Sequence, residues 1–219
     1  AGNMLSAFKP LMNKDANGSG MIWNTPYSQF VRAELTLSRT WIFGSNSGQS
    51  IAARLLAGAG HAYGNSTSLP FEKHFYAGGA NSLRGWQART VGPGLSPMDK
   101  SFVIPNQTGD MRLEANIEYR FDLFWKLAGA VFIDAGNIWT LKDDNTEDGR
   151  LAMFRWDTFA ESIAANWGVG LRLNFGFLLL RLDAGMKVHD PAREVKWVNP
   201  GQWLDTENYA LHFGVGYPF

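Results

Sequence analysis

The feature that most constrains the fold is a strict alternation of apolar and polar side chains from Asp110 to Phe124. The apolar positions are Met111, Leu113, Ala115, Ile117, Tyr119 and Phe121, and the polar positions are Arg112, Glu114, Asn116, Glu118, Arg120 and Asp122. A period of two is the period of a β-strand, whose successive side chains point to opposite faces. We therefore expect a strand with one apolar and one wet face.

The same alternation recurs along most of the chain. From Gln29 to Phe43, Leu35 and its alternate neighbours form an apolar face, and Arg39 is the exception on that face. We expect a β-bulge at Arg39 or a position near lipid headgroups. The other expected strands are Ser50–Gly64, Leu127–Trp139, Ala164–Phe175, Leu178–Val188 and Asn208–Phe219, with a weaker candidate at Gly2–Lys9. The chain is therefore all-β, with about eight strands.

The connections between these strands alternate in length. Segments 44–50, 122–127 and 175–177 are short, whereas 10–27, 64–109, 139–163 and 189–207 are long. Aromatic residues gather at the short connections: Trp41, Phe43, Phe121, Phe124, Trp125, Phe175, Phe177, Tyr217 and Phe219. Short turns on one side, long loops on the other and an aromatic girdle are typical of an outer-membrane barrel. The strands of a soluble barrel or sandwich also alternate between apolar and polar side chains, but such a protein lacks the alternation of short and long connections and the aromatic girdle. We predict an antiparallel transmembrane β-barrel.

Composition excludes several classes of function. Lys and Arg total 20 against 20 Asp and Glu, so no net basic charge attracts nucleic acid. Cysteine is absent, and the four histidines lie on separate elements without metal-ligand spacing. Segment 143–150 matches a calcium loop poorly, and no nucleophile motif of a hydrolase occurs. We expect no enzyme, no cofactor and no metal.

The inward faces of the expected strands carry charged residues to which we assign no catalytic or metal-binding role. By alternation they include Glu114, Glu118, Arg120, Asp134, Arg172, Arg181 and Asp183. Most of them are expected to form only the charge-balanced wall of a wet barrel. Asn116 on the same wall is expected to tolerate substitution better than Leu113 or Ile117 on the lipid face.

Four segments carry a family resemblance. The segment "FYAGGANSLRGW" resembles the sixth extracellular loop of the BamA/TamA superfamily of outer-membrane assembly and translocation barrels, with Arg84, Gly85 and Trp86 matching its Arg-Gly-aromatic tip. The segments "NIEYRF" and "VFIDAGNIW" resemble the strands that follow that loop in the family, in the same order. The C-terminal "GVGYPF" resembles an outer-membrane targeting signal, with Gly214, Tyr217 and Phe219 at the expected places and Phe213 departing from the pattern.

The resemblance implies a fold and a function. Residues 1–219 would be the C-terminal half of a sixteen-stranded surface-antigen-type barrel, without POTRA domains in this sequence. The function would be the folding, insertion or translocation of outer-membrane proteins in a Gram-negative outer membrane. Implied partners are outer-membrane lipid and lipopolysaccharide, unfolded client proteins, accessory lipoproteins, the missing N-terminal strands and the POTRA domains. The alternative is a stand-alone eight-stranded structural or adhesion barrel whose extracellular loops bind ligands.

The resemblance also implies roles for single residues. The Arg84 loop would fold back into the lumen, and Gly78, Gly79 and Gly85 would permit its turns and close approach. Glu118, Phe132 and Asp134 face the lumen by alternation, and the family places the loop arginine against these positions. The final strand would form one side of a lateral seam, where Gly214 and Gly216 weaken pairing.

Overall fold

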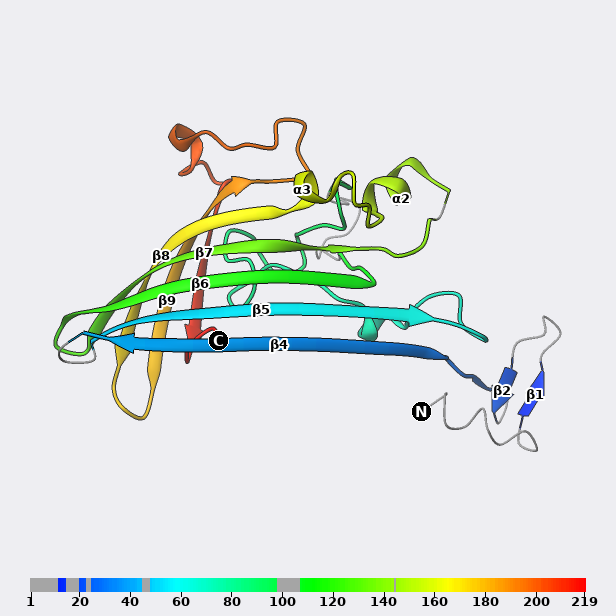
Figure 1. Ribbon diagram of the computed structural model, residues 1–219, viewed down its shortest axis with the longest axis horizontal. Helices are drawn as coiled ribbons and strands as arrows, with labels where there is room; N and C mark the ends of the chain where they lie inside the picture. Colours follow the sequence, from blue (N-terminus) through cyan, green and yellow to red (C-terminus); the bar gives the residue numbers. More distant parts are fainter. Residues whose placement is uncertain (1–11, 15–19, 23–24, 45–47, 98–106, 144) are drawn as a thin grey trace.

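A computed structural model describes residues 12–14, 20–22, 25–44, 48–97, 107–143 and 145–219. Its main element is one curved antiparallel sheet of seven strands in the order β10-β9-β8-β7-β6-β5-β4 (Figure 1). The strands are β4 (Phe30–Phe43), β5 (Gln49–Ala62), β6 (Met111–Phe124), β7 (Leu127–Trp139), β8 (Ala164–Asn174), β9 (Leu179–His189) and β10 (Tyr209–Val215). A separate small sheet contains β1 (Met12–Lys14), β2 (Gly20–Ile22) and β3 (Thr25–Pro26).

The predicted all-β, antiparallel fold is confirmed, and so are all seven strands expected after residue 28. The sheet is a partial barrel, because β4 and β10 stand at its two edges and do not pair with each other. The weaker strand candidate at Gly2–Lys9 lies outside the described residues.

Of the two alternatives at Arg39, a bulge or a position near the headgroups, the bulge is wrong. Pairing between β4 and β5 runs without a register shift from Phe30–Ala62 to Phe43–Gln49, and Arg39 stands opposite Ala53 in this regular ladder. The guanidinium of Arg39 lies 5.5 Å from the centre of the Trp41 ring. A cation above an aromatic face gains a favourable interaction, so the strand accommodates Arg39 without changing its backbone.

The two-sided rhythm of loops is confirmed. Hairpins β4–β5, β6–β7 and β8–β9 turn at one end of the sheet (Figure 1), and the long connections 63–110, 140–163 and 190–208 lie between the strands' other ends. The long connections contain η2 (Phe71–Lys73), α2 (Glu147–Ala152), α3 (Phe159–Ser162) and η3 (Pro200–Gln202). None of the helices in the described ranges is long and apolar enough to cross a membrane.

The two faces of the sheet invert the usual distribution of a soluble protein. On the outward face Leu35 is 59% exposed and Ile117 55% exposed, with Ile133, Leu182 and Leu211 similarly bare. On the inward face the charged side chains of Glu118 and Asp134 are fully buried. Apolar groups outside and satisfied polar groups inside suit a sheet whose outer solvent is lipid.

This inversion predicts a difference between two neighbouring substitutions. Leu35 points outward and Thr36 inward at the same depth of β4, and both are exposed. Arginine on a lipid-facing site near the midplane costs ~2–4 kcal/mol, whereas a wet inward site tolerates it. We therefore expect Leu35→Arg to lower the free energy of unfolding of the full-length barrel in lipid by several times more than Thr36→Arg. Equal losses in reversible unfolding would contradict the assignment of faces.

The C-terminus departs from the expected strand, which was predicted to reach Phe219. β10 ends at Val215, and Gly216 adopts φ +81°, a conformation that favours glycine. The chain then turns toward the inward face, where Tyr217 lies under Arg120 at 4.2 Å. Tyr217 is 51% exposed, and Trp41, Phe124, Trp125 and Phe177 are exposed as well. Tyr217 and Phe219 differ from those four because their rings contact inward-facing arginines.

Candidate functional site

The long β5–β6 connection packs against the polar, concave face of the sheet. Its start is tied to the end of the same connection, since Phe75 and Gly109 exchange backbone hydrogen bonds of 2.8 and 2.9 Å. The segment also has a small apolar core of its own, formed with two sheet residues: Phe75, Ala77, Leu83, Trp86, Val91, Ile138 and Ala164. The tip of the connection is therefore held as a folded unit.

Glycines shape the turn that carries the tip. Gly78 and Gly79 have φ of +93° and +96°, which side chains rarely adopt. A Cβ on Gly78 would stand 2.3 Å from the carbonyl oxygen of Gln87, so the two backbone segments could not approach. The Gly79 amide donates to the Trp86 carbonyl at 2.9 Å, and this bond closes the turn around Arg84.

Arg84 is the centre of the site, with 1% of its surface exposed. Its Nε and Nη2 donate to the two carboxylate oxygens of Asp134 at 3.0 and 2.9 Å, and its backbone amide also donates to Asp134. Its Nη1 donates to Glu118. The guanidinium carbon Cζ lies over the Phe132 ring, 3.4 Å from its centre. This is a forked ion pair combined with a cation–π contact, a geometry that arginine provides and lysine does not.

The two carboxylates have further partners. Asp134 accepts from the side-chain amides of Asn116 and Asn166 at 2.9 and 3.0 Å. Glu118 accepts from Arg120 at 2.7 Å and from Arg172 at 3.1 Å. Every carboxylate oxygen of the pair is therefore satisfied, which a buried charge requires.

The loop backbone approaches the sheet at positions that lack side chains. A Cβ on Gly185 of β9 would lie 2.2 Å from the Arg84 carbonyl oxygen and 2.7 Å from the Gly85 nitrogen. A Cβ on Gly85 would lie 2.6 Å from the Asn166 Cβ. On β8, a Cβ on Gly168 would meet the Phe132 ring at 2.3 Å. Glycines on both partners therefore create the space that the Arg84 tip occupies.

The electrostatics of the site keep Arg84 charged. Burial alone would lower the pKa of the Arg84 guanidinium, but Asp134 and Glu118 outweigh burial and hold that pKa above its ordinary value. The Arg84 guanidinium donors face the carboxylates of Asp134 and Glu118 rather than an open space. The arrangement can hold a loop against a wall.

The structure brings some predicted residues together and separates others. Arg84, Glu118, Phe132 and Asp134 are in direct contact. Trp86 lies outside the ion network, in the apolar core of the loop, with the Lys187 ammonium 5.2 Å from its ring. Gly85 has no positive φ, so its contribution is close approach alone.

The C-terminal residues, expected as a separate group, join the same network. The Phe219 ring lies 5.0 Å from the Arg54 guanidinium and 5.9 Å from that of Arg84. A Cβ on Gly214 would stand 2.5 Å from the Arg181 Nε, so the absence of a side chain at Gly214 leaves room for the Arg181 guanidinium. Gly216 redirects the chain toward these contacts.

Sequence reasoning missed several participants. Asn116 was expected to tolerate substitution, but it is 1% exposed, donates to Asp134 and accepts from Arg54 at 2.7 Å. Arg172 and Asp183, expected as ordinary wall charges, form a buried pair beside Glu118. The glycines facing each other in the β8–β9 ladder, Gly168 and Gly185, were the available signal, because adjacent missing side chains on one face indicate a close approach.

Comparison with known proteins places this geometry in context. The family model described as "Omp85 superfamily domain" matches residues 23–219. The outer membrane protein assembly factor BamA of Neisseria meningitidis serogroup B is 27% identical over 132 residues, which cover 55% of this chain and 16% of that protein. The chain thus spans about a sixth of the length of this curated relative.

A solved structure of BamA is similar in fold. The crystal structure of BamA from Haemophilus ducreyi lacking POTRA domains 1–3 superposes with a TM-score of 0.61 at 15% identity, covering 90% of this chain and 37% of that one. CdiB from Acinetobacter baumannii gives a TM-score of 0.49 at 14% identity, covering 90% of this chain and 28% of that one. The partial sheet therefore has the strand arrangement of part of a BamA barrel.

Proposed function

Because this chain belongs to the Omp85 superfamily, whose members act in outer-membrane protein assembly or translocation, we propose that it is part of an outer-membrane barrel that folds, inserts or translocates other outer-membrane proteins. The observation that carries the proposal is an open sheet edge at β10 beside a polar face that a loop already fills. The outward apolar face then meets lipid, and the long loops lie on the extracellular side.

The sheet is proposed to be the C-terminal part of a larger barrel. Both β4 and β10 lack a second neighbour among the described residues, and an unpaired edge in hydrocarbon leaves backbone N–H and C=O groups unsatisfied. Further strands of the full-length protein would pair with β4. POTRA domains are proposed to precede them, since the solved BamA relative is described as lacking POTRA domains 1–3.

The Arg84 loop is proposed to be locked in the barrel lumen. Its contacts to Glu118, Phe132 and Asp134 join the loop to β6 and β7, and Gly185 extends the contact surface to β9. A plug tied to three strands would stiffen the inner wall while the edge at β10 remains free to move. The role of the loop is thus to brace one half of the barrel.

The β10 edge is proposed to be the working element. β10 has seven residues, whereas β9 has eleven, and β10 ends at Val215, so the free edge is short and weakly held. An edge strand presents a row of unpaired N–H and C=O groups that a client strand can satisfy. Templating through hydrogen-bond exchange requires no catalytic residue, and we therefore propose a non-enzymatic protein that takes unfolded outer-membrane proteins as clients, with lipid, lipopolysaccharide and accessory lipoproteins as further partners.

Cells depleted of the full-length protein test this function. Depletion is expected to lower the level of folded outer-membrane barrels or of secreted clients, and the full-length gene is expected to restore it. Residues 1–219 alone are expected not to rescue, because the edge at β4 stays unpaired in lipid. Folded and heat-denatured barrels are separated on gels, and secretion is measured in the medium.

The readouts separate the candidates. Loss of folded barrels indicates insertion, and loss of secretion alone indicates translocation. Normal levels of both after depletion would overturn the proposal and favour a structural or adhesion barrel. Rescue by residues 1–219 alone would show instead that this segment is a complete functional unit.

A further inference from the structure

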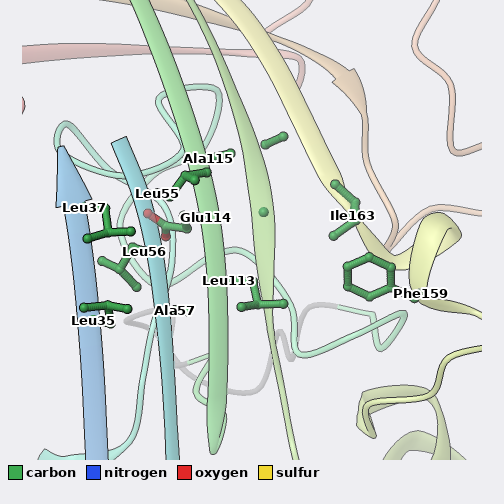
Figure 2. Close-up of a pocket in the computed structure, with 12 residues that line it drawn as sticks. Leu35, Leu37, Leu55, Leu56, Ala57, Leu113, Glu114, Ala115, Phe159 and Ile163 are labelled. Carbon is green, nitrogen blue, oxygen red and sulfur yellow. The ribbon is translucent and has the colours of Figure 1, made fainter. Parts of the chain in front are cut away.

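A groove crosses the outward face of the sheet, on the side opposite the Arg84 network (Figure 2). Its volume is about 460 Å³, within the range of ~300–1,000 Å³ that is usual for ligand sites. Side chains from four strands and from the β7–β8 connection line it. The lining residues are Leu35, Leu37, Leu55, Leu56, Ala57, Leu113, Glu114, Ala115, Ala135, Gly136, Phe159 and Ile163.

Small residues form the floor of the groove. Ala57, Ala115 and Ala135 stand on the outward faces of β5, β6 and β7, and Ala115 pairs with Ala135 across the strands. The larger side chains of Leu35 and Leu37 rise on one side (Figure 2). The hollow is therefore built into the sheet by the choice of residues.

The opposite wall comes from the β7–β8 connection, which lies over the C-terminal end of β7 near Trp139. Phe159 of α3 stacks on Trp139 with ring centres 5.8 Å apart, and the Trp139 Nε1 donates to the Ser162 Oγ at 3.0 Å. Ile163 continues the wall toward β8 (Figure 2). These contacts fix the overhang, so the groove is preformed.

An aromatic cluster of Trp139, Phe154, Trp156 and Phe159 sits beside this wall, on the long-loop side. Trp156 is 82% exposed. Arg155 next to it pairs with Asp157 at 2.7 Å, and both side chains are open to solvent. Exposed tryptophan with neighbouring charges is typical of the headgroup level of a membrane. The groove thus runs from that level into the hydrocarbon zone.

We propose that the groove binds one acyl chain of a membrane lipid, with its headgroup beside the aromatic cluster. This inference rests on the proposed function only in requiring that the outward face meets a bilayer. The groove is continuous with the exposed apolar face that includes Ile117 and Ile133. Lipid that covers this face therefore has direct access to it.

The chemistry of the lining favours an acyl chain over a peptide segment. Strands β5, β6 and β7 are paired on both sides, so they offer no backbone partners. Glu114 is the one charged residue of the lining, and its carboxylate turns to the inward face, where it accepts from Ser82 at 2.6 Å and from Arg112 at 2.8 Å. An extended peptide would bury its N–H and C=O groups unpaired here, whereas a hydrocarbon chain has none to satisfy.

Binding of defined lipids to the purified full-length protein tests the proposal. The delipidated protein in detergent is titrated with dioleoyl phosphatidylethanolamine in one arm and with lipid A in the other, and bound lipid is counted by native mass spectrometry. Wild-type protein is expected to retain one lipid molecule that survives when the others dissociate. The arm with the tighter retention identifies the headgroup that carries the chain.

Matched variants locate the site. Ala115→Leu fills the floor and Phe159→Ala removes the wall, and each is expected to weaken retention about tenfold, which corresponds to ~1.4 kcal/mol. Ala53→Leu makes the same change as Ala115→Leu on the same outward face, outside the groove, and is expected to leave retention unchanged. Because one variant adds volume and the other removes it, misfolding of one leaves the other informative.

Two outcomes would overturn the proposal. Equal retention in Ala115→Leu and Ala53→Leu would show that the lipid is ordinary surrounding lipid. A groove that holds no lipid but protects Phe159 in a complex with another protein would identify a protein occupant instead. Either result leaves the depletion phenotype intact, so failure of this inference is distinguishable from failure of the proposed function.

Discussion

Replacing Arg84 with alanine in the full-length protein is expected to lower the free energy of unfolding by ~3–5 kcal/mol, the effect of removing one partner from a buried ion pair. The change leaves Asp134 and Glu118 without their shared cation and Phe132 without its cover. Denaturant unfolding in detergent measures the loss. Limited proteolysis is expected to cut within residues 64–109, which should resist cleavage in the wild type.

Asp134→Ala is expected to cause similar damage, because it removes the acceptor of the Arg84 Nε and Nη2 and an acceptor of the Asn116 and Asn166 side-chain amides. The double variant Arg84→Ala/Asp134→Ala is expected to cost less than the sum of the single variants, since neither charge is then left unpaired. Arg84→Lys keeps the charge but loses the fork and is expected to restore little of the stability.

Arg89→Ala is the matched control in the same loop. Arg89 also carries one positive charge, but it lies near the surface, with its guanidinium 4.8 Å from the centre of the Tyr76 ring. Loss of an exposed cation–π contact costs ~0.5–1 kcal/mol. If the losses at Arg84 and Asp134 add within error, or if the wild-type loop is cut as readily as the variants, Arg84 does not hold the loop.

The second large effect is expected at Gly185, which contacts no charged group of the site directly. Alanine there places a carbon 2.2 Å from the Arg84 carbonyl oxygen, an overlap between two backbones that no rotamer change relieves. Overpacking of this kind costs ~1–3 kcal/mol, and the loop must withdraw from the wall. We expect Gly185→Ala to be destabilised and to be cut within 64–109, although every ion-pairing side chain is still present.

Gly201→Ala serves as the control for Gly185→Ala. A Cβ at Gly201 meets no atom within 4 Å, so this variant is expected to stay within ~0.5 kcal/mol of the wild type. A stable Gly185→Ala with a protected loop would show that the loop does not rest on β9.

The strands could be predicted because their two faces meet different surroundings. Along β6, apolar side chains point outward and charged or polar side chains point inward, which produces the alternation in the sequence. The strand from Leu127 to Trp139 has the bounds expected from the sequence. Alternation also identifies the face on which Glu118, Phe132 and Asp134 lie. It cannot identify which loop arginine meets them, and that expectation came from family resemblance.

The remaining features depend on pairing between distant segments. Asn116 reads as one more polar wall residue until the register places it opposite Asp134. From the sequence, Gly168 and Gly185 are only glycines that weaken two strands. The pairing of β8 with β9 places them side by side under the loop. The end of β10 at Val215 follows from one dihedral angle at Gly216 and from arginines on other strands, none of which leaves a periodic signal.

The inward turn of the C-terminus has a consequence for how this chain folds. The Phe219 ring contacts the guanidinium of Arg54 on β5, and Arg120 on β6 donates to the Phe219 carbonyl oxygen at 3.3 Å. Phe219 and Arg120 are 99 positions apart in the sequence, so this contact has a high contact order and is expected to form after the local hairpins. Contacts at Phe219 therefore require that the strands from β5 to β10 are already assembled into one sheet.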